Sequence, residues 1–308
     1  MMRSLFSAVA GLRNHQTRMD VIGNNIANVN TVAFQPSRVI FQEMYSQTIS
    51  AASGADDLVA KVGGTNPSQI GLGMTVGTID VKSSATVPQV TGETFDLCID
   101  GDGYFAIKQG SEIFYTRAGN FSVDGQGNLV TSDGGYVLGF WTAETGITDG
   151  TAGQPTLSVP GVTPNTWDPA DVDPFPDVKT ANLQPIKIDS NYTGVYVNDR
   201  GQIVGRHKVT DEVHIIGQVQ LSTFSNPRGL SKAGGNLYRE TMNSGGAVTQ
   251  NPRTGYAGEI IPYALEMANV DIAEEFSNMI ITQRGFQANS RIITVSDQML
   301  EELVNMKR

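Results

Sequence analysis

The chain has 308 residues, of which 39% are hydrophobic and 17% charged, and its net charge at pH 7 is −10. That length predicts about two domains. The acidic balance excludes nucleic acid as a partner, since nucleic-acid binding requires a basic stripe that displaces counterions. No stretch of 18 apolar residues occurs, so we expect no membrane-spanning helix and no direct membrane insertion. The start of the chain has no apolar core, and we expect no cleaved signal peptide.

An amphipathic helix is predicted from about residue 4 to residue 28. Its apolar residues recur every seven positions, at Leu5, Leu12, Met19 and Ile26. Such a repeat predicts a seam that packs against another helix in a coiled coil. Four asparagines follow at positions 24, 25, 28 and 30. Because asparagine tolerates turns and left-handed backbone, we expect the helix to stop between residues 28 and 31.

The middle of the chain favours β structure. Residues 36–75 predict an extended linker, and residues 76–140 and 186–239 predict a mainly antiparallel β domain. Two short polar runs, Gly101–Gly103 and Asp124–Asn128, lie between apolar stretches and are typical of hairpin turns.

Two segments interrupt or follow this β pattern. Residues 141–185 contain a dense series of prolines from Pro155 to Pro176, which predicts an irregular insert. Residues 240–262 are rich in glycine and predict a second extended linker.

A second helix is predicted after Pro262, with Asn269 or Asp271 as its N-cap. Its apolar residues also recur every seven positions, at Ile272, Met279, Phe286, Ile293 and Leu300. The expected order is therefore helix, linker, β domain, linker, helix, with both termini in one place. We classify the fold as α+β. Residues 1–35 and 263–308 are expected to form a coiled-coil-like inner domain, nested around the linkers and the β domain.

Patterns for catalysis or metal binding are weak. Asp96, Asp100 and Asp102 resemble a calcium loop, but Ser111 stands where that loop needs a bidentate glutamate. The three histidines, His15, His207 and His214, are expected to be too dispersed for a ligand set. The single cysteine, Cys98, lies in an apolar run and predicts a small buried hydrophobe. We therefore expect no enzyme activity, no catalytic residue, no cofactor and no metal.

Residues 19–31 resemble the N-terminal signature of the flagellar rod and hook axial protein family. Six further segments resemble the same family in the same order, at residues 96–105, 115–121, 224–230, 235–238, 269–271 and 283–289. The residues that carry the N-terminal resemblance are Asn24, Asn25, Asn28, Thr31 and Phe34. Ala33 stands where the family commonly has glycine, and alanine disfavours a left-handed backbone there.

The resemblance implies a structural subunit of the bacterial flagellum, exported without a cleaved signal by the flagellar type III apparatus and located outside the cell. It also implies a helical homopolymer, in which the nine residues of the two seams pack between subunits. The expected partners are other copies of the chain, the distal rod and hook–filament junction proteins, the hook cap and the export apparatus.

Within the family, residues 63–73 and 302–308 are similar to the hook protein. This predicts the curved, flexible hook that transmits motor torque from rod to filament, in a short form whose outer domain is reduced to residues 141–185. The alternative is the distal rod protein, a rigid drive shaft of the basal body.

Overall fold

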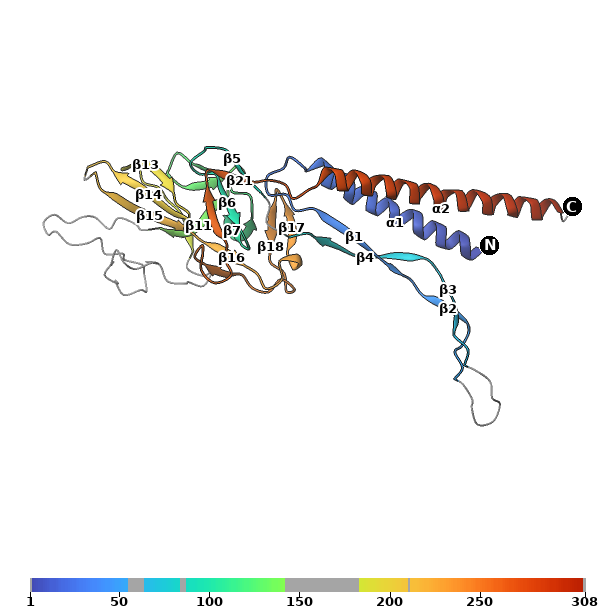
Figure 1. Cartoon of the computed structure of the whole chain (residues 1–308). Helices are drawn as coiled ribbons and strands as arrows, with labels where there is room; N and C mark the ends of the chain where they lie inside the picture. Colours follow the sequence, from blue (N-terminus) through green and yellow to red (C-terminus); the bar gives the residue numbers. More distant parts are fainter. Residues whose placement is uncertain (1, 55–63, 84–86, 142–182, 210, 307–308) are drawn as a thin grey trace. The chain divides into compact units, whose positions relative to one another are not determined.

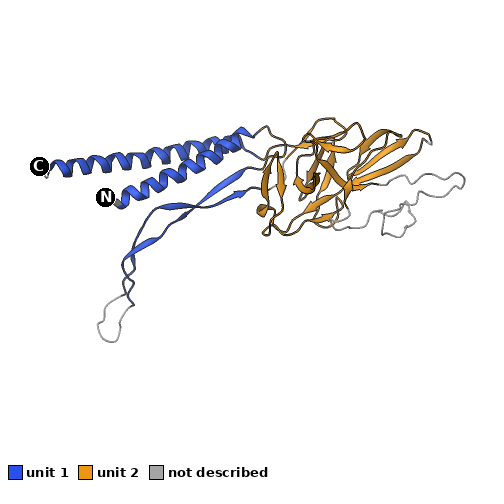
Figure 2. Cartoon of the chain, turned by 180° about the vertical axis from the view of Figure 1, so that it is seen from behind, with its two compact units in different colours: residues 1–29, 36–82, 270–308 blue, residues 30–35, 83–269 orange. Residues whose placement is uncertain are grey.

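The computed structural model describes residues 2–54, 64–83, 87–141, 183–209 and 211–306. Most of the expected proline-rich insert lies outside the described residues. The chain forms two compact units. Unit 1 comprises Met1–Val29, Pro36–Lys82 and Val270–Arg308, and unit 2 comprises Asn30–Gln35 and Ser83–Asn269 (Figure 2). Two helices and mainly antiparallel strands confirm the α+β class.

Unit 1 contains helix α1 (Met2–Ala27) and helix α2 (Ile272–Met306), which run side by side in opposite directions, so that N- and C-terminus lie at the same end of the pair (Figure 1). Of the two expected caps, Asp271 is the one that begins α2. Its Oδ1 accepts the N–H groups of Ala273 at 2.8 Å and Glu274 at 3.2 Å. Acidic residues in the first turn, Glu274 and Glu275, complement the helix dipole.

Unit 1 also contains a two-stranded ribbon. Strand β1 (Ser37–Glu43) pairs antiparallel with β4 (Met74–Val81), and β2 (Ser46–Ser50) pairs with β3 (Ser68–Gly71). Residues 36–75 were expected to be a linker, but they contain three strands and the start of a fourth. The sequence pattern missed them because the ribbon is largely exposed, so its side chains need not alternate between apolar and polar.

Unit 2 is built on a large sheet with the strand order β13-β14-β15-β11-β7-β8-β18-β17, and every neighbouring pair in it is antiparallel (Figure 1). The strands of this path are β7 (Tyr104–Gln109), β8 (Glu112–Thr116), β11 (Tyr136–Trp141), β13 (Tyr192–Val197), β14 (Gln202–His207), β15 (Val213–Val219), β17 (Ser231–Gly234) and β18 (Leu237–Arg239). Attached to it are β9 (Phe121–Val123), β10 (Leu129–Thr131), β12 (Gln184–Pro185), β16 (Leu221–Thr223) and β19 (Val248–Gln250).

Two separate strand pairs and a short helix complete unit 2. Strand β6 (Leu97–Asp100) pairs with β20 (Glu259–Pro262), and β5 (Pro88–Val90) pairs with β21 (Ala264–Glu266). A 3-10 helix, η2, spans Pro227–Gly229. Because β19 and β20 fall within residues 240–262, the second expected linker is instead part of this unit.

The core of unit 2 has two clusters of buried side chains. Along β7, Phe105 belongs to the first cluster, whereas its neighbours Tyr104 and Ala106 belong to the second. Successive residues of a strand point to opposite faces, so this strand is buried on both sides. Full burial of an aromatic side chain such as Phe105 contributes roughly 1.5–3 kcal/mol.

One of the two expected hairpin turns is a different structure. Residues 124–128 do join a hairpin, β9 to β10, in which Asp124 Oδ1 accepts the N–H groups of Gln126 at 2.8 Å and Asn128 at 2.7 Å. Residues 101–103 do not, because β6 pairs with β20 while β7 belongs to the large sheet. The segment is a corner between two sheets, and Gly101 and Gly103 have φ of +114° and +148°.

Candidate assembly site

Most residues of the predicted seams are partly buried in the helix pair. On α1, Leu5, Leu12, Met19 and Ile26 are all half-buried. On α2, Met279, Ile293 and Leu300 are half-buried, whereas Ile272 and Phe286 are exposed. Their role in packing between subunits stays a prediction.

Four pairs of residues that include polar side chains or glycine lie against each other across the two helices. Arg18 Nη2 donates to Asn278 Oδ1 at 3.2 Å, and Asn25 Nδ2 donates to Glu275 Oε1 at 2.9 Å. Glycine allows a close approach further along. A Cβ atom on Gly11 would lie 2.5 Å from Nδ2 of Asn289.

Gly285 of α2 likewise faces the imidazole of His15, whose ring atoms would lie 2.8 Å from a Cβ at that position. Burial, followed by the charge of Arg18, lowers the pKa of His15. We call the eight residues of these four pairs the contact line: Gly11, His15, Arg18, Asn25, Glu275, Asn278, Gly285 and Asn289.

Many apolar residues of α2 remain exposed in the single chain. The buried residues of α2 are Thr282 and Ser296. Its exposed apolar residues are Ile272, Phe276, Ile280, Ile281, Phe286, Ile292, Val295, Met299, Leu303, Val304 and Met306. We call this set the open face of α2. Exposed apolar side chains in this number make the helix a candidate for contact with another protein surface.

The family residues at the end of α1 hold the chain together within unit 1. Asn25 is 1% exposed. Its Oδ1 accepts the Ser37 N–H at 3.1 Å, and its Nδ2 donates to Ser37 O at 2.8 Å as well as to Glu275. Asn25 therefore joins α1, the start of β1 and α2. Asn28 Nδ2 donates to the backbone and side-chain oxygens of Asn24, which closes the helix end.

Four consecutive residues of unit 2, at positions 32–35, form a segment that we call the strap. Within it, Phe34 is buried, and its N–H donates to Thr31 O at 3.3 Å. The backbone of each strap residue also makes a hydrogen bond to a distant part of the same unit. Val32 O accepts from Asn236 Nδ2 at 2.9 Å, and the Ala33 N–H donates to Glu266 O at 2.9 Å. Phe34 O accepts from the Asn269 N–H at 3.1 Å, and Gln35 O accepts from Lys232 Nζ at 3.1 Å.

Ala33 corrects the expectation from sequence. Its φ is +54°, in the left-handed region that alanine was expected to disfavour, and the residue is 3% exposed. A left-handed backbone costs a residue with a Cβ roughly 1–2 kcal/mol. The hydrogen bond to Glu266 and the surrounding strap contacts offset that cost.

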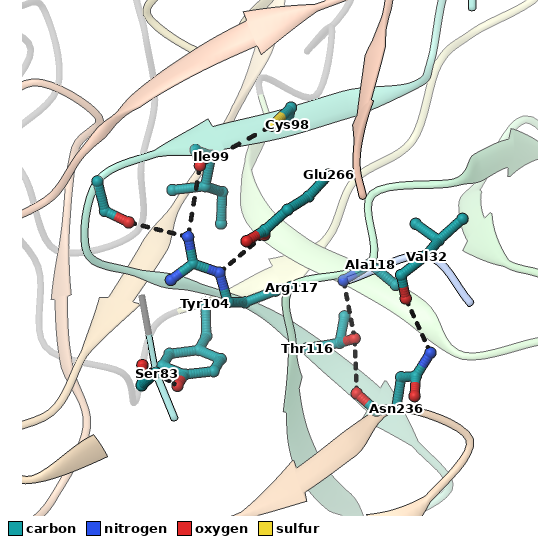
Figure 3. Close-up of polar contacts among 11 residues, drawn as sticks. Val32, Ser83, Cys98, Ile99, Tyr104, Thr116, Arg117, Ala118, Asn236 and Glu266 are labelled. Carbon is teal, nitrogen blue, oxygen red and sulfur yellow. Dashed lines mark hydrogen bonds and ion pairs between the residues drawn. The ribbon is translucent and has the colours of Figure 1, made fainter. Parts of the chain in front are cut away.

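A buried ion pair lies beside the strap (Figure 3). Arg117 Nε is 2.8 Å from Glu266 Oε2, and both side chains are 2% exposed. Arg117 Nη2 also donates to the carbonyl oxygens of Gly101 at 2.9 Å and Ile99 at 3.4 Å. Sequence reasoning missed this pair because its members are 149 positions apart, and no local pattern relates them.

Burial also sets the pKa of a neighbouring thiol, that of Cys98. Cys98 is 1% exposed, which confirms the expected buried hydrophobe. Its burial, reinforced by the charge of Glu266, raises its pKa to about 11. The thiol is therefore neutral at physiological pH, and it is a poor nucleophile.

Groupings typical of metal or membrane sites are not found in the described part of the chain. No cluster of three or more histidine, cysteine, aspartate or glutamate side chains is placed to hold a metal ion there. None of the described helices is long and apolar enough to cross a membrane. His207 and His214 lie closer than expected, with ring centroids 6.2 Å apart, because β14 pairs with β15.

Comparison with known proteins identifies the family. The model of the flagellar hook protein FlgE/F/G D1 domain matches residues 98–205. The models of the flagellar basal body rod FlgEFG protein C-terminal region and of the flagella basal body rod protein match residues 262–306 and 5–35. The chain is 46% identical over 309 residues to the flagellar basal-body rod protein FlgG of Bacillus subtilis, with all of both chains covered. The chain belongs to the flagellar hook and rod protein family.

Other members of this family are similar along the whole chain. The flagellar hook protein FlgE of Borreliella burgdorferi is 32% identical over 445 residues, with 100% of both chains covered. The flagellar basal-body rod protein FlgG of Caulobacter vibrioides is 31% identical over 304 residues, with 97% of both chains covered.

Proposed function

We propose that the chain is the distal rod protein of the flagellar basal body, a structural subunit of the rigid drive shaft. The observation that carries this proposal is the 46% identity to a basal-body rod protein along the whole length of both chains. The hook, which the sequence favoured, has less support. The hook protein of Borreliella burgdorferi is 32% identical, and its alignment spans 445 positions against the 308 of this chain.

The hook-like segments cover too little of the chain to outweigh the identity to the rod protein. Residues 63–73 and 302–308 form a small part of the chain, whereas the comparison with the rod protein draws on every position. This chain and the rod protein also have nearly the same length. A hook protein with a reduced outer domain is therefore not needed to explain the length of this chain.

The helix pair supports an assembling subunit. The open face of α2 exposes apolar side chains that a second copy of the chain would bury. Heterologous contacts that do not close into a ring produce helical filaments. We propose that the half-buried seam residues pack against neighbouring copies and complete the coiled-coil-like arrangement there. The proposed partners are other copies, adjoining rod and hook proteins, and the flagellar type III export apparatus.

Deletion of the gene in its host tests the proposal through electron microscopy of purified basal bodies. A rod subunit predicts loss of the distal rod and of all structures beyond it. An intact rod that lacks only the curved hook would instead establish the hook function.

Complementation gives a second, independent test. Expressed in Bacillus subtilis that lacks its own FlgG, this chain is expected to restore swimming. The matched control is a strain that lacks its hook protein, which the chain should not rescue.

A further inference from the structure

The buried ion pair and the strap share one residue. The backbone oxygen of Glu266 accepts the N–H of Ala33. The carboxylate of Glu266 binds Arg117 (Figure 3). The strand that carries Glu266, β21, has three residues, and among the described strands it pairs only with β5, whose residues are exposed. The position of Glu266 therefore depends strongly on its side-chain partner.

The strap is also held from the neighbouring side of Arg117. Thr116 Oγ1 donates to Asn236 O at 2.8 Å, and Asn236 Nδ2 donates to Val32 O (Figure 3). Thr116 and Arg117 are consecutive, so their two sets of contacts form a closed ring. The ring leaves the strap at Val32 and returns to it at Ala33. Thr116 ends β8, which pairs with β7 over five positions in the large sheet. Thr116 thus anchors one side of the ring in the sheet, and the strap forms the other side.

We propose that Arg117 and Glu266 form a latch that holds the strap on unit 2, so that breaking the pair releases residues 32–35 while the large sheet stays folded. The guanidinium group cannot lose its charge in a protein. When a buried pair loses one partner, the charge that remains is strongly destabilising until it reaches water. The element that opens most easily responds first, and here that element is the strap together with β21.

Amide hydrogen exchange of the full-length protein tests the latch. In Glu266→Gln, exchange at the Ala33 and Asn269 amides is expected to accelerate about tenfold or more, while β7 and β8 keep their protection. Glu259→Gln is the matched control. Glu259 pairs with Arg253 at 3.2 Å in a solvent-exposed ion pair, so neither the strap nor the sheet should respond.

A variant on the other side of the ring keeps the proposal testable if Glu266→Gln does not fold. Asn236 has a φ of +59°, which glycine adopts freely, so Asn236→Gly removes the contact to Val32 without straining the backbone. Exchange in the strap should accelerate in this variant as well. In the double variant, the two effects should be less than additive, because the latch and Asn236 hold the same segment.

Two results would overturn the latch. One is equal loss of protection in the strap and in β7 and β8, which would mean that the pair stabilises the whole unit. The other is the absence of any coupling to the strap, seen as unchanged strap exchange in Glu266→Gln and as strictly additive effects in the double variant.

Discussion

In strand β7, consecutive side chains enter two different buried clusters, whereas in helix α2 the buried residues are Thr282 and Ser296. The sheet of unit 2 therefore buries apolar side chains on both sides of β7 within one chain. Helix α2 of unit 1 leaves many apolar side chains exposed. From this difference we expect that a single chain supplies the stability of the sheet, while the helices gain part of theirs when other copies cover them.

The largest expected effect tests the open face of α2. Ile281→Asp should raise the protein concentration needed for polymerisation about a hundredfold or more, because assembly would bury an unpaired charge. The free energy of unfolding of the monomer should change by less than about 0.5 kcal/mol, since Ile281 is 61% exposed. Sedimentation and chemical denaturation measure the two quantities. Ser290→Asp, at an exposed polar position of the same helix, is the control, and equal loss of assembly in both variants would contradict the assignment of the open face.

The same substitution in the two regions compares them directly. Phe105→Ala should lower the free energy of unfolding by about 3–5 kcal/mol, because Phe105 is fully buried in the sheet. Phe286→Ala should cost the monomer only about 1–2 kcal/mol, because Phe286 keeps 37% of its surface exposed. Denaturant unfolding of purified monomer measures both. Similar costs would show that α2 is already packed in the single chain.

Alkaline pH should weaken unit 2. Burial raises the pKa of Cys98 from 9.0 to about 11, so the folded state disfavours the thiolate. The corresponding stability is complete below pH 9 and is lost as the pH rises from about 9 to 11, by up to about 2–3 kcal/mol. Cys98→Ala should remove this part of the pH dependence, measured as the free energy of unfolding against pH. Burial also raises the pKa of Tyr115 to about 12, so a decline at higher pH should remain in the variant.

The smallest expected effect concerns Ala33. Ala33→Gly should stabilise the protein by up to about 1 kcal/mol, since glycine adopts the left-handed φ of +54° without steric cost. Glycine also gains entropy in the unfolded chain, which limits the gain. Thermal unfolding measures the change. A clear loss of stability would mean that the methyl group of Ala33 contributes more packing energy than the backbone strain costs.

Periodicity predicted the two helices, and the packing of the seam residues between subunits stays a prediction. Every position on a helix recurs about every seven residues, so the apolar series through Leu12 and the contact line through Gly11 have the same period. The sequence pattern therefore did not reveal that the missing Cβ atoms of Gly11 and Gly285 leave room for Asn289 and His15. Strands were also predicted well where one or both faces are buried, as in β7. The largely exposed strands within residues 36–75 gave no such apolar–polar alternation in the sequence, and that segment was expected to be a linker.

The sequence by itself determined the α+β class, the buried state of Cys98 and the family, and it narrowed the cap of the second helix to Asn269 or Asp271, because each depends on local pattern or on a run of family residues. Only the tertiary structure decided the strap, the Arg117–Glu266 pair and the left-handed backbone of Ala33. These features join segments more than a hundred residues apart, and the energy that maintains them comes from burial and hydrogen bonds that no local segment contains. For the same reason, only the folded structure shows which apolar residues of α2 stay exposed.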